Sequence, residues 1–82
     1  MPYIKQERRE ELHSIVKLIH QMDVRFNGDL NYILFAVCKM FVEPSYNNYK
    51  NYIGELRQCA TEIERRLLAP YEDKKWEENG DI

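Results

Sequence analysis

The sequence predicts an all-α protein, a small bundle of three main helices followed by a short C-terminal helix. Apolar residues recur at three- and four-residue steps through most of the chain, which is the spacing of one helix face. Between these periodic stretches lie Asn27-Gly28-Asp29 and Glu43-Pro44, which are typical of helix ends. A chain of 82 residues is expected to form a single helical domain, residues 1–82.

The first expected helix covers residues 5 to about 23. Its charged residues lie away from an apolar stripe that consists of Leu12, Ile15, Val16, Ile19 and Met22. Beyond the helix, Asn27 and Gly28 are expected to adopt positive φ angles, because both tolerate the left-handed conformation. Asp29 is then expected to cap the N-terminus of the second helix with its side chain.

The second expected helix runs from Leu30 to about Val42 and is apolar on nearly every side. Lys39 is the only charged residue between Tyr32 and Val42. A helix of this kind must be covered all round. We expect one set of residues to face the other helices, namely Leu30, Ile33, Leu34, Val37 and Phe41. The remaining residues are expected to form an interface in a homo-oligomer, a dimer or higher, through Tyr32, Phe35, Ala36 and Met40.

The third expected helix begins after Ser45, a natural N-cap, and continues to Ala69, where Pro70 is expected to interrupt it. Its apolar stripe consists of Tyr49, Ile53, Leu56, Ala60, Ile63 and Leu67. Gly54 lowers helix propensity by about 1 kcal/mol relative to alanine, so we expect another helix to cross closely there. Pro70 can open a fourth helix, Tyr71 to Glu78, that stops at Asn79-Gly80.

Aromatic residues gather on the third and fourth expected helices. Tyr49 and Tyr52 are expected to contribute to the oligomer interface, because rings with a polar tip suit half-buried rims. Tyr71 and Trp76 are expected to dock the C-terminal segment onto the body. A base-stacking platform would need a basic groove, yet the formal net charge is −2 and the basic residues are dispersed. We therefore expect no nucleic-acid partner.

Three strings of the sequence can be compared with known families. They are Met1-Pro2-Tyr3-Ile4-Lys5-Gln6-Glu7-Arg8-Arg9, Gly28-Asp29-Leu30-Asn31-Tyr32, and Arg65-Arg66…Pro70-Tyr71-Glu72-Asp73-Lys74-Lys75…Glu78-Asn79-Gly80-Asp81. Together they resemble a family of small, uncharacterised proteins of bacteria and their phages. The resemblance implies a small helical protein, intracellular or phage-encoded, without an assigned activity.

Paired carboxylates offer the main alternative function, a metal-dependent nucleotide pyrophosphohydrolase. Such compact helical enzymes hold Mg²⁺ between Glu-x-x-Glu and Glu-x-x-Asp pairs on facing helices, and oxygen ligands suit this ion. Glu7 and Glu10 have the first spacing and are the candidate metal ligands. Glu78 and Asp81 have the second, but they flank an expected helix stop. We therefore interpret the carboxylates as surface residues and expect no catalytic residues, metal or cofactor.

The remaining candidates for chemistry are two histidines, two cysteines and two basic pairs. His13 and His20 share one helix face but are separated by about 10.5 Å, too far to bind one ion. Cys38 and Cys59 lie among apolar residues, without a histidine nearby in sequence, and we interpret both as reduced core thiols. The pairs Arg65-Arg66 and Lys74-Lys75 fit surface pairing of Glu62 with Arg66 and of Lys74 with Glu78, with an acidic ligand between them as the alternative.

The start of the chain lacks the apolar stretch of a signal peptide, so we expect a cytoplasmic protein. The apolar run at 32–42 is shorter than the about 20 residues that cross a bilayer, so no membrane is expected. The sequence therefore predicts a self-associating helical protein with a binding or structural role.

Overall fold

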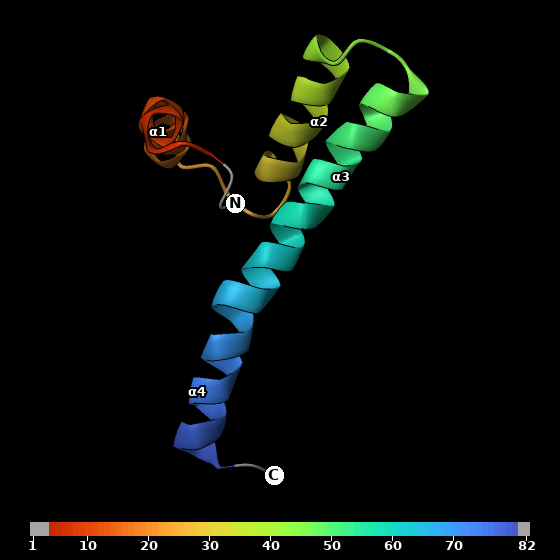
Figure 1. The fold of residues 1–82 in the computed structure, drawn as a ribbon. Coiled ribbons are helices and arrows are strands. Elements are labelled where there is room, and N and C mark those ends of the chain that lie inside the picture. Colours follow the sequence, from red (N-terminus) through yellow and green to blue (C-terminus); the bar gives the residue numbers. More distant parts are fainter. Residues whose placement is uncertain (1–3, 81–82) are drawn as a thin grey trace. The chain divides into compact units, whose positions relative to one another are not determined.

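A computed structural model describes residues 4–80, and all the regular structure in that range is helical (Figure 1). The elements in chain order are α1 (Gln6–Gln21), α2 (Asp29–Phe41), α3 (Tyr46–Ile63), the π-helical turn η1 (Glu64–Leu68) and α4 (Ala69–Asn79). They divide into two compact units, of which the first ends at Pro44 and the second begins at Ser45. The all-α class predicted from the sequence is confirmed.

The end of α1 differs from the prediction. The helix stops at Gln21, where the backbone N–H of Met22 donates to the carbonyl oxygen of Leu18 and the N–H of Asp23 donates to that of His20. Asp23 is the non-glycine residue with a positive φ, 52°, and Asn27 is not in that region. The connection therefore needs two left-handed positions, Asp23 directly after the helix and Gly28 with φ 136° before the next. The prediction for Gly28 was correct, and that for Asn27 was wrong.

Asp29 does not cap α2 as predicted, because Gly28 occupies the N-cap position and Asp29 is the first residue of the helix. The carboxylate instead reaches back along the connection, where its Oδ2 accepts a hydrogen bond of 3.0 Å from the backbone N–H of Arg25. The guanidinium of Arg25 in turn donates to Asp23 at 3.0 Å. A carboxylate in the first turn also complements the positive end of the helix dipole.

The connection between α2 and α3 follows the prediction closely. Val42 leaves the helical conformation with φ −90° and ψ 121°, ahead of the disfavoured position before Pro44. Ser45 is the N-cap of α3, and its Oγ accepts a hydrogen bond of 3.0 Å from the backbone N–H of Asn48. The predicted cap is therefore confirmed.

Pro70 does not end the third helix. The segments α3, η1 and α4 form one unbroken helix, drawn from green to blue in Figure 1. Pro70 lacks an N–H and its ring would clash with the carbonyl four residues earlier in a regular α-helix. The π turn relieves this conflict, since the N–H of Ala69 reaches five residues back to Glu64. Gly80, with φ 79°, ends the helix as predicted.

A closed apolar core is missing from the part of the chain that the structure describes. None of residues 4–80 is buried, although 44% of the chain is hydrophobic. At Gly54 an added Cβ would meet no atom within 4 Å. The structure thus shows well-formed helices whose apolar faces remain accessible.

Candidate interaction surface

The exposed apolar residues of α2 include most of those predicted for an interface. Tyr32, Phe35 and Met40 are exposed, with Phe35 at 65%, whereas the small Ala36 is half-buried. The structure thus places three of the four predicted α2 residues in contact with solvent.

The residues of α2 that were expected to face inward divide into two groups. Leu30, Ile33 and Leu34 are half-buried, in agreement with the prediction. Val37 and Phe41 are exposed, and Phe41, at 77%, is more exposed than Phe35. Phe41 is the last residue of α2, and the chain turns away immediately after it. The exposure of these two residues differs from the prediction that all five face other helices.

The continuous helix carries a second apolar surface, which we call the seam. Its five large residues range in exposure from 36% for Leu56 to 66% for Leu67, and Ala60 is exposed as well. The seam consists of Tyr49, Ile53, Leu56, Ala60, Ile63 and Leu67. Steps of four and three residues alternate along it, which is the heptad pattern of helices that pair in coiled coils. The stripe is visible in the sequence, and its heptad spacing is the signal that indicates a paired helix.

The π turn shifts the C-terminal end of the seam by one position. Five residues separate equivalent positions across such a turn, so Leu68 succeeds Ile63 on the same face. Leu68 is less exposed than Leu67, 47% against 66%.

Tyr52 lies beside the seam and is half-buried, whereas Tyr49 belongs to the seam itself. Tyr71 and Trp76 are both more than half exposed on α4, and the ammonium of Lys75 lies 5.6 Å from the centre of the Tyr71 ring. Because α4 continues α3 instead of folding back, these two rings do not dock the C-terminal segment onto α3 as the prediction requires within this unit.

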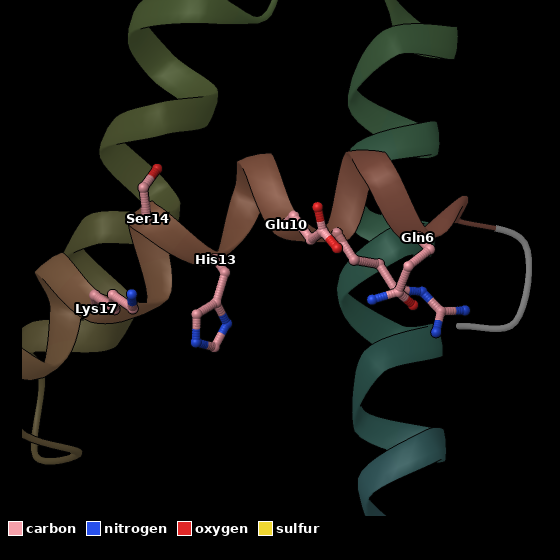
Figure 2. A pocket seen from close by; sticks show the side chains of 6 residues that line it. Gln6, Glu10, His13, Ser14 and Lys17 are labelled. Carbon is pink, nitrogen blue, oxygen red and sulfur yellow. The ribbon is translucent and has the colours of Figure 1, made fainter.

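A polar face of α1 holds one of the two candidate metal ligands. Figure 2 shows Gln6, Glu10, His13, Ser14 and Lys17 along this helix, and Arg9 completes the lining of a shallow surface depression. Glu7 and Glu10 both lie on α1 and are exposed. Within residues 4–80, no three His, Cys, Asp or Glu side chains lie close enough together to hold a metal ion.

Of the second carboxylate pair of the hydrolase alternative, Glu78 is the member that lies in the described range. Glu78 lies on α4 and pairs with Lys75 at 3.4 Å, where Lys74 was the predicted partner. Asp81 lies outside the described residues. This alternative therefore gains no support from the geometry.

The basic pair at 65–66 forms ion pairs within the continuous helix, as predicted for Arg66. Glu62 lies 3.4 Å from Arg65 and 3.8 Å from Arg66, and its side chain is only 15% exposed. These are neighbours at helical spacing and give surface pairing of modest strength.

The two cysteines are free thiols in different surroundings. Cys38 is half-buried on α2, whereas Cys59 is exposed beside the seam. Interpreting Cys59 as a core thiol was wrong, because the continuous helix leaves this side open.

Among residues 4–80, no helix has both the length and the apolar character needed to span a membrane.

The whole chain matches one family model, which covers residues 1–82. The chain belongs to the family described as "Domain of unknown function (DUF6899)". Neither the curated proteins nor the solved structures include a match to it. An uncharacterised family agrees with the resemblance drawn from the sequence.

Proposed function

We propose that this protein is a self-associating helical module with a binding or structural role, and that it is not an enzyme. One observation carries the proposal: none of residues 4–80 is buried, while large apolar side chains are exposed on both α2 and the continuous helix. Exposed apolar surface of this extent marks an association site. A chain of 82 residues also lies near the size at which oligomerisation is needed for stability.

The energetic argument depends on symmetry. Burying one phenylalanine side chain contributes about 1.5–3 kcal/mol, and a twofold interface uses each residue twice. Phe35, with Tyr32 and Met40 nearby on α2, can therefore supply a large share of the association energy. Tyr49 and Tyr52 add rings whose hydroxyl groups can remain in water at the edge of the interface.

The setting that we propose is the cytoplasm of a bacterium or of a phage-infected cell. Free thiols at Cys38 and Cys59 suit a reducing compartment. The strings that resemble proteins of bacteria and their phages support the same setting.

The proposal is tested by the variant Phe35→Glu. We expect it to be monomeric or insoluble, since two new charges would have to be desolvated in each dimer. Lys17→Glu, on the exposed polar face of α1, is the control and should leave the mass in sedimentation unchanged. If the wild type and both variants sediment as monomers at micromolar concentration, the chain covers its own apolar residues and the proposal fails.

A further inference from the structure

We propose that the seam of the continuous helix pairs with the same seam of a second copy in antiparallel orientation. This inference rests on the proposed self-association and adds which helix pairs and in which direction. The occupant is a second copy of this chain, because the residues of the seam and of its two flanks complement themselves when the helix direction is reversed.

The apolar layers match best in the antiparallel arrangement. Full overlap of the two seams places Leu56 opposite Ala60 of the partner subunit and Ile53 opposite Ile63 of the partner subunit. Each layer then contains either one large and one small side chain or two side chains of equal size, and both combinations fill the space between the helices. A parallel pair in register would place Ala60 against its own copy and leave a gap at that layer.

The charged residues on one flank of the seam also favour the antiparallel pair over the parallel one. Lys50, Arg57 and Glu64 recur at seven-residue steps on one side of it. In antiparallel coiled pairs this flank faces its own copy, so Lys50 lies beside Glu64 of the partner subunit, and symmetry produces this contact twice. Arg57 lies near its own copy on the twofold axis, a single like-charge contact. The attractive contacts outnumber the repulsive one.

The other flank carries Tyr52 and Cys59 at the same spacing, ahead of the π turn. In a parallel pair the neighbours across the seam would be Tyr52 with Arg57, and Cys59 with Glu64. That arrangement contains no contact between opposite charges, so charge complementarity favours the antiparallel dimer.

A charge exchange tests the direction of the pair. Lys50→Glu and Glu64→Lys should each weaken dimerisation about tenfold, because each turns two attractive contacts into two repulsive ones. The double variant restores both contacts and should bind within about threefold of the wild type. Lys50 and Glu64 are too far apart along one helix to interact within a chain. Failure of the double variant to recover, with the wild type dimeric, would overturn the pairing.

Spin-label distances give an independent measurement on the full chain. Both native cysteines are first replaced, by Cys38→Ser and Cys59→Ser. One spin label per chain is then attached to a new cysteine, either Asn47→Cys or Thr61→Cys. These two positions are two heptads apart on the same side of the helix. A helix rise of 1.5 Å per residue and a twofold axis near Gln58 separate the Asn47 labels by about 33 Å along the axis, and the Thr61 labels by about 9 Å.

Each possible result decides between the arrangements. A clearly longer Asn47 distance than Thr61 distance supports the antiparallel pair. Two equal short distances mean a parallel pair, and two long ones in a dimer mean that α2 alone forms the interface; either overturns this inference but leaves the self-association standing. A monomeric wild type overturns both.

Discussion

The helix α2 and the continuous helix α3–η1–α4 both expose apolar residues, but they do so in different patterns. On α2 the exposed residues Tyr32, Phe35 and Phe41 lie on several sides of the helix. On the continuous helix they follow one seam with heptad spacing, between flanks of polar and charged residues. A helix that is apolar on all sides must be buried, but its residues do not determine whether a partner helix packs parallel or antiparallel to it. A seam with charged flanks determines both which face of the helix is in contact and the orientation of the partner helix.

The largest effect is expected from a charge in the middle of the seam. Leu56→Glu removes two buried leucines from each dimer, worth about 1.5–3 kcal/mol apiece, and adds two charges that must be desolvated. We expect no dimer at micromolar concentration by sedimentation. Gln58→Glu, on the opposite side of the same helix, should dimerise like the wild type. A Leu56→Glu protein that remains dimeric would show that α2 alone carries the association.

Replacing Pro70 examines how the continuous helix is held together. Pro70→Ala returns an N–H to the helix and removes the need for the π turn, so we expect stabilisation by about 1–3 kcal/mol and a higher melting temperature. Helix content by circular dichroism should not fall. Glu72→Ala, at an exposed position of α4, is the control and should change stability by no more than about 0.5 kcal/mol. A lower melting temperature for Pro70→Ala would mean that the π turn itself makes stabilising contacts.

Removing the cap of α3 should have a smaller effect. Ser45→Ala loses the hydrogen bond between the side-chain oxygen and the N–H of Asn48, which costs about 1 kcal/mol. We expect thermal unfolding to shift down by about 4–8 °C, as is usual for a domain of this size. Ser45→Asp keeps an acceptor at the same position and should retain most of the stability. Equal losses in both variants would contradict the capping role.

The smallest effect is expected from divalent metal ions. Glu7 and Glu10 lie on α1 without a third ligand nearby among residues 4–80, so calorimetry with Mg²⁺ or Mn²⁺ should show no saturable heat. Binding that disappears in Glu7→Gln plus Glu10→Gln would contradict the non-enzymatic proposal and favour the hydrolase.

Local chemistry explains which parts of the fold could be predicted from the sequence. The cap at Ser45, the end of α2 before Pro44 and the stop at Gly80 depend on a few neighbouring residues, and all three agree with the structure. The prediction that Pro70 interrupts the helix was wrong because a π turn can accommodate a proline within a continuous helix, and no residue type predicts such a turn. Asp29 was misread because Gly28 competes for the cap position.

The surface was harder to predict than the helices. Phe41 and Cys59 were assigned to the interior because apolar residues in a helix usually have a neighbour to pack against. Whether such a neighbour exists depends on contacts between segments far apart in the sequence, or between chains, which periodicity does not encode. The three- and four-residue steps of the seam were visible in the sequence, and their heptad spacing was the signal that could have indicated a paired helix.

Sedimentation equilibrium of the wild-type protein over a range of micromolar concentrations tests the central claim most directly. If the chain self-associates, the apparent mass is at least twice the 10.0 kDa of one chain at all these concentrations, or rises to that value as the concentration increases. A single species of 10.0 kDa at all these concentrations would contradict the account, and would show that the chain covers the apolar residues of α2 and the seam by itself.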